Sequence, residues 1–111
     1  ISDFETASME KTELFPAIEG TNMSASFGHI FGGGYAAGYY GYKWAEVLDA
    51  DAYSYFTETG IFNKVTAASF RKNILERGGT EKPSDLYTRF RGKEPSIEAL
   101  LKRSGLTTEQ T

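Results

Sequence analysis

Residues 35–57 read YAAGYYGYKWAEVLDADAYSYFT, and this stretch decides the fold class. At about 100° per residue, its apolar side chains gather on one side of a helix. They are Ala36, Ala37, Tyr40, Trp44, Val47, Leu48 and Tyr55. Gly60 follows as a C-terminal stop, because glycine readily adopts the left-handed conformation that ends many helices. The pattern therefore predicts one long helix over 35–57, the longest in the chain.

Helical patterns recur on both sides of this stretch. Before it, Ser2–Leu14 is compatible with a helix that Pro16 ends, and residues 17–34 are glycine-rich and irregular. Three helices are expected after it: Lys64–Arg77 between Asn63 and Gly78-Gly79, Pro83–Arg91, and Pro95–Ser104 before Gly105. The tail 107–111 should fray. Because strand signals are weak, the sequence predicts an all-α fold of four to five helices, with 1–111 forming a single (sub)domain.

The amino-acid composition argues against several classes of function. The 111 residues are 40% hydrophobic and 24% charged, so the chain can form a core. A net charge of −3 argues against a nucleic-acid partner. No apolar run approaches the ~20 residues that cross a membrane. The absence of cysteine excludes disulfides and thiolate metal sites. Because the first residue is Ile1 rather than Met, we expect a fragment or a processed product.

Chemistry concentrates in residues 27–42, FGHIFGGGYAAGYYGY, which hold the only histidine, six of twelve glycines and four of seven tyrosines. An imidazole N–H and a phenol O–H are donors that can stabilise a developing oxyanion. On a helical wheel one face of the long helix collects three phenols and two carboxylates: Tyr35, Tyr39, Tyr42, Glu46 and Asp49. Packing or an interface is the plainer interpretation of such a row. Gly32-Gly33-Gly34 lacks the GxxxxGK[ST] pattern of a phosphate-binding loop.

A resemblance runs from about Phe15 to Leu106. It is carried by NMSASFGHIFGGGYAAGYYGYKWAEVLDADAY, followed by GIFN, FRKNIL, RGG, RFRGKEPSIEALL and GL. This series resembles the C-terminal end of the thimet-oligopeptidase-like zinc metallopeptidases, in particular the oligopeptidase A and peptidyl-dipeptidase (dipeptidyl carboxypeptidase) branches. The resemblance implies a C-terminal part of a larger, mostly helical peptidase. In that family an HExxH helix and a downstream Glu hold the zinc, and this chain contains neither, so it is expected to bind no metal alone.

The resemblance also implies roles for individual residues. Residues 17–34 match a substrate-channel loop, in which His29 contacts the substrate backbone. Tyr42 matches the tyrosine that stabilises the tetrahedral intermediate, which makes Tyr42 and His29 the catalytic expectations. The other substrate-binding expectations are Gly33, Gly34, Tyr35 and Tyr39. The spacing departs from the thimet oligopeptidase branch, because six positions rather than five separate His29 from Tyr35.

The implied partners are short peptide substrates and the upstream catalytic part of the same enzyme. The expected location is the cytoplasm, with a periplasmic or exported enzyme left open. Two other functions stay open: a non-catalytic helical protein-interaction module that uses the tyrosine face, and a small-molecule domain that uses the glycine loop. The isolated chain is expected to lack peptidase activity and to form a homo-oligomer through its aromatic face. Endopeptidase and dipeptide-releasing activities are not distinguished.

Overall fold

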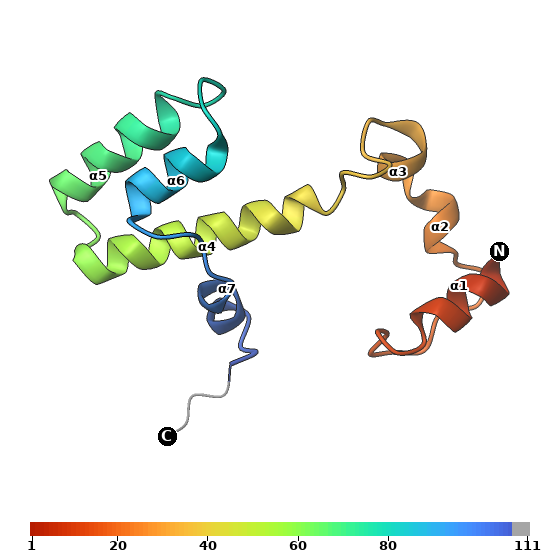
Figure 1. Ribbon diagram of the computed structural model, residues 1–111. Helices are drawn as coiled ribbons and strands as arrows, with labels where there is room; N and C mark the ends of the chain where they lie inside the picture. Colours follow the sequence, from red (N-terminus) through yellow and green to blue (C-terminus); the bar gives the residue numbers. More distant parts are fainter. Residues whose placement is uncertain (108–111) are drawn as a thin grey trace. The chain divides into compact units, whose positions relative to one another are not determined.

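The computed structural model describes residues 1–107, and this part of the chain is all-α, as predicted. The chain divides into two compact units, Ile1–Tyr40 and Gly41–Thr111. The first unit contains α1 (Ser2–Met9), α2 (Met23–Ser26) and α3 (Gly28–Gly32). The second contains α4 (Gly41–Thr59), α5 (Lys64–Phe70), the π-helical turn η1 (Arg71–Leu75), α6 (Pro83–Arg91) and α7 (Glu98–Arg103) (Figure 1). No helix in residues 1–107 is long and apolar enough to cross a membrane.

The longest helix is α4, but it begins at Gly41 rather than at the predicted Tyr35. Residues 35–40 form a turn in which the N–H groups of Gly38 and Tyr39 both donate to the carbonyl of Tyr35. Gly38 and Gly41 explain the late start, because glycine is a poor helix former. At its other end α4 runs to Thr59, and Gly60 has a φ of 102°, as expected of a glycine terminator.

Residues at the helix ends determine where the remaining helices of the second unit begin and end. Asn63 caps α5, because its side-chain oxygen accepts from the N–H groups of Val65 and Thr66 at 2.9 and 3.2 Å. A helix begins at Lys64 as predicted, although its second half is the π-helical η1 and it ends at Leu75 rather than at Arg77. Helix α6 has the predicted bounds. Helix α7 is shorter than the predicted 95–104.

The first unit departs from its prediction in two ways. Helix α1 ends at Met9, short of Leu14, and residues 17–34 include α2 and α3 rather than irregular chain alone. Both carboxylate oxygens of Glu5 accept backbone N–H groups at the start of α2, from Met23 and Ser24, at 2.8 Å each. Hydrogen bonds from Ser24 and from Met23 lower the pKa of Glu5. A side chain far away in sequence therefore stabilises α2. The predicted fraying concerns 107–111, of which 108–111 lie outside the described residues.

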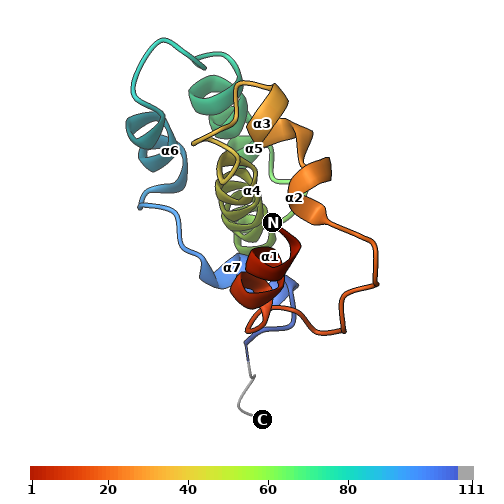
Figure 2. The same cartoon turned by 90° about the vertical axis from the view of Figure 1, so that its right-hand side faces the viewer.

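The core of the second unit is an aromatic cluster that α6 places against α4 and α5. Phe90 is only 3% exposed, and its ring lies 5.1 to 6.2 Å from four other rings, those of Tyr55, Phe56, Phe70 and Tyr87. Aromatic pairs at such distances add to the free energy gained by burial alone. Figures 1 and 2 show α5 and α6 on one side of α4 and α7 on another.

A buried polar network crosses from α6 to α4 beside this core. The Tyr87 hydroxyl donates to Asp51 Oδ2 at 2.6 Å, and Arg91 donates to both carboxylate oxygens of Glu58 at 2.7 and 3.0 Å. Asp51 is 2% exposed and Arg91 is 8% exposed. Burial and the bond to Asp51 raise the pKa of Tyr87 above its usual range. Burial alone would lower the pKa of Arg91, but Glu58 and Asp51 outweigh it and raise that pKa. Tyr87 is thus neutral and Arg91 charged at neutral pH.

The first prediction concerns Phe90. Phe90→Ala should destabilise the chain by about 3–5 kcal/mol because it leaves a cavity among four rings, whereas Phe90→Leu should cost less than about 1.5 kcal/mol. Urea unfolding followed by the fluorescence of Trp44, the only tryptophan, measures both changes. Tyr53→Ala is the control, since Tyr53 is 58% exposed. Equal effects of Ala and Leu at position 90 would contradict the packing described.

The second prediction concerns pH and Glu81, whose carboxylate accepts from Arg77 and Arg89. Hydrogen bonds from Arg89 and Arg77 lower its pKa from 4.5 to about 2. A lowered folded-state pKa gives stability that is present above about pH 4.5 and is lost as the pH falls through about 2. Glu81→Gln should therefore lower the urea midpoint at neutral pH and match the wild type near pH 2. Glu10→Gln, in the other unit, is the control, and its urea midpoint should equal that of the wild type at both pH values.

Candidate functional site

The first unit brings together three of the residues expected to bind substrate. His29 lies on α3, and its ring centre is 5.9 Å from that of Tyr35 and 5.6 Å from that of Tyr39. The Phe27 ring packs edge-on against Tyr39 at 4.6 Å. His29, Tyr35 and Tyr39 are all exposed, so one accessible patch holds an imidazole and two phenols. These groups can donate hydrogen bonds to an extended peptide backbone.

Gly33 allows this arrangement for a steric reason. A Cβ at Gly33 would lie 3.3 Å from the carbonyl oxygen of His29, closer than most real Cβ contacts, whereas a Cβ at Gly34 would meet open space. Gly33 therefore lets the chain fold back closely behind His29 before it reaches Tyr35. Of the two glycines expected to bind substrate, only Gly33 has a packing requirement in this unit. Their contact with substrate stays a prediction.

Tyr42 belongs to the second unit, in the first turn of α4, and is 49% exposed. Glu46 and Asp49 follow it on the same helix face, at i+4 and i+7. Each carboxylate has a cationic partner: Lys43 lies 2.7 Å from Glu46, and Arg103 of α7 lies 2.6 Å from Asp49. Such exposed pairs contribute little to stability, but they reduce the negative charge on the face that carries the Tyr42 hydroxyl.

The predicted row of three phenols on one helix face is wrong for Tyr35 and Tyr39. Both residues lie in the turn before α4, so the helical wheel applies only from Gly41 onward. The same late start affects Tyr40, which the helical pattern places on the apolar side and which is 73% exposed. Tyr35 and Tyr39 nevertheless meet at His29, because a turn and α3 bring them there rather than helical periodicity.

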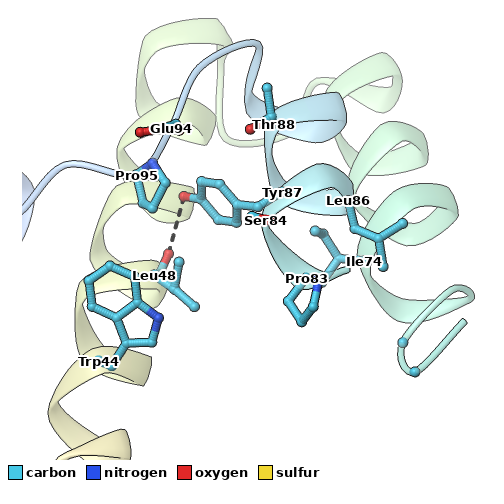
Figure 3. Close-up of a pocket in the computed structure, with 12 residues that line it drawn as sticks. Trp44, Leu48, Ile74, Pro83, Ser84, Leu86, Tyr87, Thr88, Glu94 and Pro95 are labelled. Carbon is cyan, nitrogen blue, oxygen red and sulfur yellow. Dashed lines mark hydrogen bonds between the residues drawn. The ribbon is translucent and has the colours of Figure 1, made fainter. Parts of the chain in front are cut away.

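A second feature, which sequence reasoning missed, is an apolar pocket of about 460 Å³ within the second unit. Its wall includes Trp44 and Leu48 of α4, Ile74 of η1 and Tyr87 of α6. Figure 3 shows the Tyr87 hydroxyl directed at the Leu48 carbonyl, at 3.4 Å, with Pro95 beside it. The available signal is the i, i+4 spacing of Trp44 and Leu48, which the helical pattern places together on the apolar side. Trp44 is in fact 51% exposed.

The described residues do not form a metal site. No group of three His, Cys, Asp or Glu side chains in residues 1–107 could hold a metal ion, and the sequence contains one histidine and no HExxH motif. A zinc site needs three or four such ligands close together, and residues 1–107 do not supply such a group. What the chain itself offers is hydrogen-bond donors: the His29 patch on the first unit and Tyr42 on the second.

Comparison with known proteins identifies the family. The model of peptidase family M3 matches residues 1–106. The chain is 63% identical over 93 residues to oligopeptidase A of Haemophilus influenzae. This match covers 84% of the chain and 14% of that protein. It is 49% identical over 100 residues to the probable cytosolic oligopeptidase A of Arabidopsis thaliana, and this match covers 86% of the chain and 14% of that protein. It is 42% identical over 107 residues to dipeptidyl carboxypeptidase of Escherichia coli, and this match covers 96% of the chain and 16% of that protein.

The chain thus spans about one seventh of the length of these curated relatives. The family model nevertheless matches nearly all of the chain's own residues, and this match shows the family to which the chain belongs. The chain belongs to peptidase family M3.

Proposed function

We propose that this chain is the C-terminal part of a zinc metallopeptidase that hydrolyses short peptides, and that it supplies substrate-binding and oxyanion-stabilising side chains. The observation that carries the proposal is the patch of His29, Tyr35 and Tyr39 in a chain of the M3 family. The non-catalytic interaction module is less well supported, because the identity to named peptidases extends over most of the chain.

Peptide hydrolysis passes through a tetrahedral intermediate whose oxygen carries negative charge. A phenol hydroxyl aimed at that oxygen stabilises it more than it stabilises the neutral ground-state carbonyl, and so accelerates the reaction. We assign this task to Tyr42. His29, Tyr35 and Tyr39 are assigned to donate to the substrate backbone, with Gly33 and Gly34 in the loop that approaches it. The pairing of Glu46 with Lys43 and of Asp49 with Arg103 reduces the repulsion that these carboxylates would exert on negative charge near Tyr42.

The metal belongs to the rest of the proposed enzyme. Zinc, when bound by residues outside this chain, would supply Lewis-acid polarisation of the scissile carbonyl and a reactive water. The upstream part of the enzyme is accordingly the partner of this chain, and short peptides are its substrates. A cytoplasmic location is proposed by analogy with the relative named probable cytosolic oligopeptidase A.

Tyr42→Phe in the longer enzyme tests the oxyanion role. Loss of one such donor should lower kcat by about 10²–10³-fold, roughly 2.7–4 kcal/mol, because the interaction forms in the transition state. KM should change little. Tyr53→Phe is the matched control, since Tyr53 lies on the same face of α4 about three turns away. Steady-state kinetics on a short peptide, with zinc content and melting checked, give the result; normal turnover in Tyr42→Phe would remove the residue from the mechanism.

His29→Ala should behave differently from Tyr42→Phe. It removes a proposed donor to the bound backbone and also a ring that packs beside Tyr35 and Tyr39, so KM should rise and kcat should fall together. His29→Gln, which keeps an N–H donor, should recover part of the KM effect. The same kinetic assay decides, and an unchanged KM in His29→Ala would exclude a role for His29 in substrate binding.

A further inference from the structure

One guanidinium contacts three side chains that follow one another along a single face of α4. Asp51, Tyr55 and Glu58 are spaced i, i+4 and i+7. Arg91 donates to both oxygens of Glu58, at 2.7 and 3.0 Å. Its Cζ lies 4.7 Å from the centre of the Tyr55 ring, and its Nε lies 3.4 Å from Asp51 Oδ2. We call these four residues the Arg91 clasp; it spans about two turns of α4.

The clasp sets the geometry of α4 more than it stabilises the fold. The side chains of Arg91 and Asp51 are 5% and 3% exposed, and a buried ion pair gains little net stability over an apolar substitute. A forked guanidinium is directional, however, whereas apolar contacts are not. The Tyr87 hydroxyl adds a second directional bond, 2.6 Å long, to Asp51. Together these contacts restrict the rotation and the axial position of α4 against α6.

We propose that Arg91 is a positioning residue for Tyr42, acting through the rotation of α4; this rests on the function proposed above. Tyr42 precedes Asp51 by nine residues, which places it roughly 13 Å along the helix and on the opposite side. A side chain about 5–6 Å from the helix axis moves by about 1 Å for a rotation of roughly 10°. A misplacement of that size at a reacting centre can lower the rate by about 10²-fold. The clasp therefore controls where the Tyr42 hydroxyl points.

Arg91→Lys in the longer enzyme tests the proposal. Lysine keeps the positive charge, but a single ammonium cannot bond both oxygens of Glu58 and also reach Asp51. We expect kcat to fall by about 10- to 100-fold with little change in KM. The matched control is Thr66→Val, which breaks the 2.9 Å hydrogen bond between Thr66 and Thr59 at the contact of α5 with α4. That variant should lower the melting temperature and leave kcat unchanged.

A double-mutant cycle separates positioning from general damage. If Arg91 acts through Tyr42, Arg91→Lys should cause no further loss of kcat in a Tyr42→Phe background. Additive losses, or a normal kcat in Arg91→Lys beside a low one in Tyr42→Phe, would overturn the positioning role and leave the proposed function standing. A normal kcat in Tyr42→Phe would overturn both. Should Arg91→Lys not fold, Glu58→Gln loosens the clasp from its exposed end, where Glu58 is 53% exposed, and the same cycle applies.

Discussion

The burial of charge between α4 and α6 is the constraint on which the second unit depends. Asp51 and Arg91 are almost inaccessible, and an unpaired charge in such a place costs several kcal/mol. Each is therefore surrounded by partners: Tyr87 and Arg91 for Asp51, and Glu58, Asp51 and the Tyr55 ring for Arg91. The aromatic core beside them excludes water. Hydrogen bonds are directional and apolar contacts are not, so these bonds restrict the register of α6 on α4 more than apolar packing alone would.

The candidate functional residues of the two units have different physical support. Tyr42 lies on the 19-residue α4, whose later turns contact the core and include Asp51, which forms a buried ion pair with Arg91. His29, Tyr35 and Tyr39 are carried by a short helix and a glycine-rich turn, and none of α1, α2 and α3 contains a buried residue. Elements with little burial change conformation at low cost. The proposed substrate-binding patch thus lies on elements with little burial, whereas the proposed oxyanion donor lies on a helix whose later turns are packed.

Membership of the M3 family gives a context for features that a small domain would not normally keep. The second unit leaves Trp44 half exposed beside an apolar pocket of about 460 Å³, and Phe62 is 95% exposed. The matched residues make up only 14% of each of these relatives, and the proposed function joins the chain to an upstream catalytic part. Large exposed rings are consistent with a chain that is one component of a larger folded enzyme.

The sequence by itself determined the all-α class, the bounds of α6, the Asn63 cap and the glycine terminators after α4 and α7, because these features depend on signals within one helical turn. It misplaced the start of α4, where the apolar pattern continued across glycines that do not sustain a helix. Only the tertiary structure decided that His29 meets Tyr35 and Tyr39 off the helix, and that Arg91 meets Glu58, 33 residues away. Such contacts depend on how elements pack, and no local pattern encodes which side chain a distant helix will present.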